Sequence, residues 1–524
     1  MKMARLLGWS AALCLAAMAV QAQEANQLEK FDQQLQQMQQ NFDKITRAQR
    51  EENEALKKQL EEVRQKLSEL SAEQQRQKAA PVAAPLAAPP VAPSPPAAPT
   101  TPPATVATAP PEPQKAWSPT SPITLFGGQR NYLNLSFDGL FSAGTSTAGD
   151  IERLELGGHD PIQRGFTVQN VETVFEGKVD PYFRGQGNVV LQIDAGGETI
   201  LEMEEAYLET LALPLGLQAK AGTFFTEFGR LNPTHPHTWD FVDQPLVNGR
   251  FFGGDGLRNP GGRISWLVPT PFYSELFFTV QNSQGETALS FRNDHEGGLF
   301  FGRPHTQERV RDFGDMLFVP RYAASFNLSD AQTLVTGTSA AFGPNSSGTG
   351  ADTQIYGVDL FWKWKSPRQH SGFPFVNWQT EAMLRKYQAE DFTNAGDDLN
   401  ANGAIGPGEA DVFGDGAIHA LPREALTDYG FYSQVAYGIR KGWVAALRGE
   451  YLFPEQKGLY EGIASPDPDR ASRWRISPNL TYYPSEFSKI RLQYNYDHRN
   501  GLGNDHSVWV QFEFLLGSHA AHKF

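Results

Sequence analysis

The sequence has 524 residues, which is enough for two or three ordinary domains or for one very large β-structure. Its mean hydropathy of -0.43 excludes a polytopic helical membrane protein, which needs many apolar runs of about 20 residues. The formal net charge of -14 argues against nucleic acid as a partner, because no basic field is present to displace phosphate counterions. The single cysteine, Cys14, excludes a disulfide framework. A polar average still permits a membrane β-barrel, whose strands alternate apolar and polar residues.

Residues 1–22 are predicted to be a secretory signal peptide. Lys2 and Arg5 precede an apolar run over 6–20, and the small residues Val20 and Ala22 suit cleavage after Ala22. Cys14 lies inside this segment, so the processed chain would contain no cysteine. We therefore expect an exported protein.

Residues 23–78 are predicted to form a periplasmic coiled coil. The segment lacks glycine and proline, and its apolar residues recur three and four apart over 28–45 and again over 56–70. The eleven-residue step between the two runs is a stutter that relaxes the supercoil locally. A single amphipathic helix packed on a domain is the alternative, but the narrow apolar seam favours a coiled coil. The core residues leave dimer and trimer open.

Residues 79–122 are predicted to be a linker. Most of this segment is rich in alanine and proline, a composition that cannot bury a core and favours extended polyproline II. Together with the helix before it, the linker resembles a stalk more than a catalytic domain.

Residues 123–524 are predicted to form an all-β transmembrane barrel of about 16 antiparallel strands. Apolar and polar residues alternate in short runs, as where Ile490 and Leu492 alternate with Arg491 and Gln493. A soluble sandwich would show the same alternation. The expected strand cores are 131–143, 166–178, 186–194, 203–212, 217–224, 261–268, 273–282, 316–328, 332–342, 354–364, 375–389, 426–439, 442–453, 473–483, 487–497 and 506–516.

The connections between these strands favour an outer-membrane barrel over a sandwich. Long connections at 144–165, 225–260, 283–315, 343–353, 390–425 and 454–472 are interspersed with short ones such as 213–216 and 484–486. Bacterial outer-membrane barrels have long outer loops, short periplasmic turns and even strand numbers.

With its stalk, strand pattern and long third loop, the chain resembles trimeric outer-membrane porins, especially the phosphate-selective-porin-like group and sugar porins with an N-terminal coiled coil. The resemblance implies a homotrimer in outer-membrane lipid, with the stalk in the periplasm and in reach of peptidoglycan. It also implies passive diffusion of small polar or ionic solutes, with loop 225–260 narrowing the pore. The clustered lysines of the phosphate-selective pattern are missing here.

Charged residues on the expected inward faces suggest a selectivity filter. Opposed rows of basic and acidic side chains across a constriction order polar solutes and filter ions. The alternative is that these charges pair with one another and keep the interior wet. The candidate wall residues are Arg448, Arg473, Arg475 and Arg491 on the basic side, and Glu172, Glu176, Asp194 and Glu204 on the acidic side, while the third loop adds Arg230, Asp240, Asp243 and Arg250.

Two motifs could bind metal. Residues 398–409 match the spacing D-x-[DN]-x-[DN]-G-x5-E, in which alternate oxygens converge on Ca²⁺, although a flexible polar loop has a similar composition. The candidate calcium ligands are Asp398, Asn400, Asn402 and Glu409.

Two histidine pairs could bind zinc or copper, with Asp240 near the first pair, but a structural or incidental role fits these histidines better. These pairs are His235 with His237 and His519 with His522.

No enzyme signature is present: the sequence lacks a nucleophile elbow, a phosphate loop and a zinc-protease helix. No cofactor is required, and a structural calcium ion is the one candidate. The predicted function is therefore a porin. The alternatives are a substrate-specific metal or oxyanion uptake channel or receptor, and an envelope tether that the barrel anchors.

Overall fold

The protein is described by a computed structural model over residues 123–127, 131–178, 180–293, 299–306, 308–395, 416–455 and 470–517. The predicted signal peptide, coiled coil and linker lie outside the described residues. So do the candidate calcium ligands Asp398, Asn400, Asn402 and Glu409 and the second histidine pair, His519 and His522.

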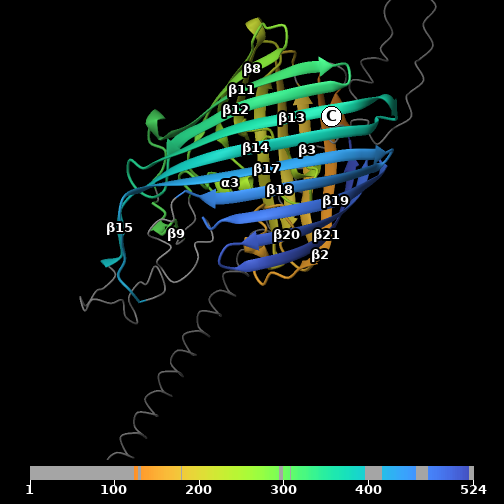
Figure 1. Ribbon diagram of the computed structural model, residues 1–524. Coiled ribbons are helices and arrows are strands. Elements are labelled where there is room, and N and C mark those ends of the chain that lie inside the picture. The colour runs from red at the N-terminus through yellow and green to blue at the C-terminus, as the bar shows by residue number, and fades with distance from the viewer. Residues whose placement is uncertain are drawn as a thin grey trace, which may run out of the picture. The chain divides into compact units, whose positions relative to one another are not determined.

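Sixteen antiparallel strands close into a barrel, which confirms the predicted fold (Figure 1). Each strand pairs with the next along the chain, and the last strand pairs with the first, with Phe141 opposite Phe512. The strands are β2 (Tyr132–Ser146), β3 (Gly165–Lys178), β4 (Phe183–Ile193), β5 (Thr199–Thr210), β6 (Leu217–Phe225), β7 (Arg258–Leu267), β8 (Tyr273–Asn282), β11 (Met316–Ser329), β12 (Gln332–Pro344), β13 (Asp352–His370), β14 (Phe373–Ala389), β17 (Glu424–Arg440), β18 (Trp443–Pro454), β19 (Arg473–Ser485), β20 (Ser488–Arg499) and β21 (Gly503–Leu516).

A short strand not predicted from the sequence, β1 (Ile123–Gly127), completes the closing seam. It pairs with the first residues of β2, where Ile123 lies opposite Leu135. Strand β21 pairs with β2 only from Phe137 onward. The strand β1 therefore continues the edge that β21 leaves uncovered.

The two ends of the barrel differ in the length of their connections. One end has short turns, such as 330–331 and 441–442. The other end carries long loops, and we call the first (147–164) L1 and the third (226–257) L3. Two connections at the loop end, 194–198 and 500–502, are short.

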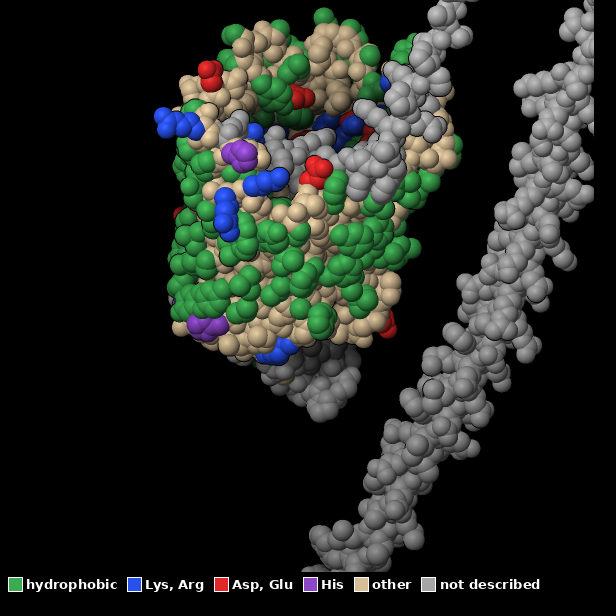
Figure 2. All heavy atoms as spheres, turned by 90° about the vertical axis from the view of Figure 1, so that its right-hand side faces the viewer, with side chains coloured by type: hydrophobic (Ala, Val, Ile, Leu, Met, Phe, Trp, Pro, Cys, Tyr) green, Lys and Arg blue, Asp and Glu red, His purple; other side chains and the backbone are tan. Residues whose placement is uncertain are grey.

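The barrel is apolar outside and polar inside. On β20 the outward Ile490 and Leu492 are 41% and 50% exposed, whereas the inward Arg491 is 1% exposed. The side view shows mostly hydrophobic side chains on the outer wall (Figure 2). Such a surface would be costly in water and is stable in hydrocarbon. Among the described residues, no helix is long and apolar enough to cross a membrane.

Short helices and strand pairs lie in the loops. They are α2 (Ile151–Leu154) in L1; η2 (Pro236–Thr238) and α3 (Leu246–Phe252) in L3; η1 (Pro214–Gly216) and η3 (Phe313–Asp315) beside β6 and β11; and the pairs β9 (Leu299–Phe300) with β10 (Arg303–Pro304) and β15 (Phe392–Thr393) with β16 (Ala420–Leu421). The main buried apolar cluster packs α3 against the inner faces of β11 to β18, through residues such as Phe251, Leu317 and Tyr432. The L3 loop therefore folds into the lumen.

Candidate functional site

The L3 loop occupies the lumen and contacts three parts of its wall. Its segment 237–243 meets β18 to β20, its helix α3 packs on the apolar stretch described above, and its histidines reach the acidic side chains of β2, β3 and β5. Few of these contacts are local in sequence. The position of L3 is thus fixed by side chains that the barrel points inward.

Polar side chains of β18, β19 and β20 bind the backbone of L3. Arg491 donates to the carbonyl oxygens of Trp239 and Phe241 at 2.9 and 3.0 Å. Asn479 donates to the carbonyl of Asp240 at 2.9 Å, and Arg448 donates to that of Asp243 at 2.9 Å. A loop with irregular backbone needs such partners when it is buried. Inward side chains of β18, β19 and β20 supply these hydrogen-bond donors.

Asp243 is the charged centre of this contact. It lies between two arginines: Arg448 Nη2 donates to its Oδ1 at 2.6 Å, and Arg475 binds its Oδ2. Gln493 and Asn495 also donate to its two oxygens, at 2.7 and 2.9 Å. Burial by itself would raise the pKa of Asp243, but the two guanidinium groups outweigh burial and hold this pKa at about 2.

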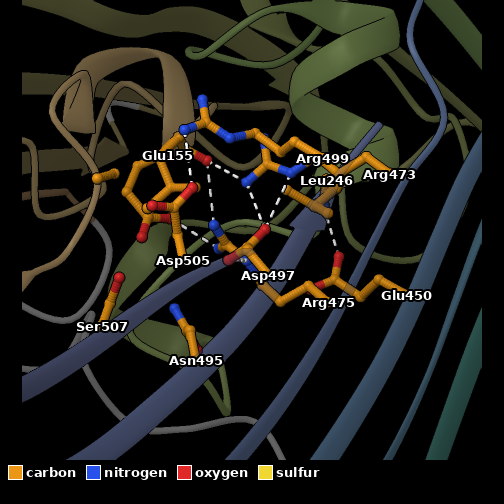
Figure 3. A network of polar contacts seen from close by, with 12 residues as sticks. Glu155, Leu246, Glu450, Arg473, Arg475, Asn495, Asp497, Arg499, Asp505 and Ser507 are labelled. Carbon is orange, nitrogen blue, oxygen red and sulfur yellow. Dashed lines mark hydrogen bonds and ion pairs between the residues drawn. The ribbon is translucent and has the colours of Figure 1, made fainter. Parts of the chain in front are cut away.

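The same network holds L1 in place (Figure 3). Arg475 donates to Glu155 of L1 at 2.7 Å and to Asp497 at 2.7 Å, and Arg473 donates to Asp497 at 2.7 Å. Both arginines also bind the carbonyl of Leu154. Two loops and three strands therefore share one buried set of ion pairs.

The start of L3 is held by a carboxylate of β14. Glu381 Oε1 accepts hydrogen bonds from the backbone N–H groups of Arg230 and Leu231, at 3.2 and 2.8 Å. Gly229 makes this approach feasible: its φ is +60°, and a Cβ there would lie 2.1 Å from Glu381 Oε2.

The tip of L3 inserts histidines among acidic side chains. His235 Nδ1 lies 2.8 Å from Glu204, and its Nε2 lies 3.0 Å from Glu205. His237 Nδ1 lies 3.1 Å from Asp138 and 3.3 Å from Glu172. Burial would lower the pKa of His237, but Asp138 and Glu172 outweigh it and raise this pKa to about 10.

A cavity of about 450 Å³ lies between L3 and the barrel wall at the turn end of the strands. It is bordered by charges of both signs, and Figure 2 shows such side chains inside a hollow of the barrel. The charged side chains that line it are Glu176, Arg184, Glu205, Lys220, Glu227, Arg230, Asp240, Lys363 and Lys489.

The sequence-predicted wall residues divide into those that line this cavity and those that hold loops. Glu176, Arg230 and Asp240 line the cavity. The four predicted wall arginines are buried under L1 and L3 and do not line this cavity.

The remaining predicted residues also have defined places. Glu172 is buried beneath the histidines, and Arg250 donates to the carbonyl of Ala471 at 2.7 Å. Asp194 lies in the short turn after β4, where it accepts a hydrogen bond from the backbone of Glu198 at 2.7 Å, because β4 ends one residue earlier. It is not grouped with Glu172 and Glu204.

Sequence reasoning missed most of the cavity charges. Lys220 and Glu205 lie on inward faces of β6 and β5, and Lys363 on that of β13. For Lys363, the sequence did show alternation with outward apolar residues, which indicates an inward side chain. Glu205 was obscured because the pairing of β4 and β5 shifts at Asn188, which turns consecutive glutamates, Glu204 and Glu205, toward L3.

Comparison with known proteins gives partial similarity. An uncharacterized protein of Aquifex aeolicus is 28% identical over 421 residues, which cover 75% of this chain and 79% of that protein. The outer membrane channel DcaP of Acinetobacter baumannii has a TM-score of 0.45 at 14% identity, covering 74% of this chain and 98% of that one. The anion-selective porin from Comamonas acidovorans has a TM-score of 0.40 at 7% identity, covering 74% and 100%. A scan against protein-family models finds no match. We therefore base the function on the geometry of the barrel.

Proposed function

We propose that the protein is an outer-membrane porin through which small polar or ionic solutes diffuse passively, and that L3 forms its constriction. The observation that carries this proposal is the cavity bounded by L3, with charges of both signs, inside a closed barrel whose outer wall is apolar. Water and ions need such a polar path across hydrocarbon. The mixed charges suit many small solutes.

The proposed assembly is a homotrimer of the phosphate-selective-porin-like type. Its support is the sequence: the apolar seam over 23–78 permits a trimeric coiled coil, and the chain would be exported to the outer membrane with this stalk in the periplasm near peptidoglycan. The long linker would separate stalk and barrel.

Swelling of liposomes that contain the purified protein tests the proposal. We expect sugars to enter at rates that fall with sugar size. Thr238 is exposed at the cavity, so Thr238→Trp should slow entry of the larger sugars. Thr270 lies in the β7–β8 turn, and Thr270→Trp is the matched control that should leave the rates unchanged. Folded protein that admits no sugar would contradict the proposal.

A further inference from the structure

The buried contact at the tip of L3 has the composition of a metal site. Two loop histidines meet four carboxylates from three strands: Asp138 of β2, Glu172 of β3, and Glu204 and Glu205 of β5. All six side chains are buried. Two sets of three ligand atoms lie within 4.8 Å of one another, Asp138–Glu172–His237 and Glu172–Glu204–His235.

Glu172 belongs to both sets. Its Oε1 lies 3.3 Å from His235 Nδ1, and its Oε2 lies 3.3 Å from His237 Nδ1. The two imidazole rings are stacked with their centroids 5.7 Å apart. A carboxylate whose two oxygens face two different histidines has the geometry of a bridging ligand.

The cluster holds four carboxylates and two imidazoles, so net negative charge remains even when both histidines are protonated. Four carboxylates buried together are costly unless positive charge compensates them. Lys489 of β20 is paired with Glu513. Asp138 is 3% exposed, and its Oδ1 has no hydrogen-bond donor among the residues that the structure describes. Asp138 faces His237 through Oδ2, and its buried Oδ1, without a donor in the described part of the chain, is suited to a metal ion.

The surroundings hold the ligands in place. Asn188 donates to Glu172 Oε1 at 2.6 Å, and the backbone N–H of Phe225 donates to Glu205 Oε1 at 3.0 Å. Pro236 between the histidines restricts the backbone that carries them. In known metal sites, such supporting hydrogen bonds orient the side chains that bind the metal.

We propose that this cluster binds a divalent first-row transition-metal ion at either or both of two neighbouring positions. Asp138, Glu172 and His237 form one position, and Glu172, Glu204 and His235 form the other. Imidazole with carboxylate suits zinc, manganese, iron and cobalt. Because the histidines belong to L3 and the carboxylates to the wall, the ion fastens the constriction loop to β2, β3 and β5. This consequence for L3 rests on the proposed function, whereas binding itself does not.

The test is a titration of the full-length protein in detergent, after treatment with a chelator and dialysis. Calorimetry with Zn²⁺ should show at least one ion bound per chain, and Co²⁺ should give visible absorption bands of a nitrogen- and oxygen-bound ion. We expect His237→Ala and the isosteric Glu172→Gln to weaken affinity by roughly tenfold or more. Circular dichroism would establish that each variant is folded.

The matched control is His506→Ala, which removes an exposed histidine of β21 outside the cluster and should leave affinity unchanged. The metal site would be overturned if the wild-type protein bound no Zn²⁺. It would also be overturned if folded Glu172→Gln and His237→Ala bound Zn²⁺ with unchanged affinity. The titration measures metal binding and not transport, so the two proposals can fail separately. A barrel that binds Zn²⁺ but admits no solute into liposomes would refute the porin function and leave the metal site standing.

Discussion

Two walls of the lumen carry similar charged residues and use them differently. On β18 to β20, Arg448, Arg475 and Arg491 are at most 1% exposed and bind L3 or L1. Around the cavity, Lys220 and Lys363 remain partly exposed. An inward charge therefore acts on a solute only where no loop has covered it. Buried ion pairs position a loop, whereas the charges beside open water set the local potential.

The largest expected effect comes from removing the centre of the buried wall. Asp243→Ala leaves Arg448 and Arg475 without their shared carboxylate, which should destabilise the docked loop by about 3–5 kcal/mol. We expect faster proteolysis within L3 and a larger, noisier channel conductance. Asp194→Ala, in the turn after β4, is the control that should change neither. Equal effects of both variants would contradict the distinction between the two walls.

A smaller effect is expected at the start of L3. Gly229→Ala places a Cβ against Glu381 and a side chain at positive φ, which should cost about 1–3 kcal/mol. The thermal midpoint of the barrel should fall, and proteolysis of L3 should increase less than in Asp243→Ala. Gly449→Ala on β18 has open space for its Cβ and serves as the control. An unchanged midpoint in Gly229→Ala would show that L3 does not depend on this contact.

Removing charges that line the cavity should change the ion selectivity of the channel without changing the stability of the barrel. Neutralising Lys220 and Lys363 together as glutamine should shift the permeability ratio toward cations, by up to about fivefold, since unit charges in water interact by about 1 kcal/mol at 4 Å. The reversal potential in a salt gradient measures this ratio. A comparable shift in folded Arg491→Gln, whose guanidinium is buried under L3, would show that buried charges also filter ions.

The smallest expected effect is that of moderate acid on the docked loop. The folded pKa of Asp243, about 2, lies below its ordinary 3.8, so its ion pairs contribute fully above pH 3.8 and are lost as the pH falls through about 2. Because Glu155, which shares Arg475, has a pKa of about 7, the window that isolates Asp243 lies lower, and proteolysis of L3 should be the same at pH 5 and pH 4. Release of L3 between pH 5 and pH 4 would mean that groups other than Asp243 control its docking.

The sequence predicted the strands well because each strand has both a period of two and a boundary set by a turn or loop. It also predicted which arginines of β19 and β20 point inward. It did not predict their partners, because Arg475 and Asp243 are 232 positions apart and L3 has no periodicity that reports its path. Asp194 was misplaced for a local reason: the alternation of β4 continues one residue past the last residue of the strand.

Single-channel conductance of the full-length protein in a planar bilayer tests the central claim most directly. Wild type should insert with stable conductance steps, in groups of three if the trimer forms, and Asp243→Ala should give larger steps because L3 no longer fills the lumen. Folded wild-type barrels that conduct no ions, together with an equally silent Asp243→Ala, would contradict a channel constricted by L3.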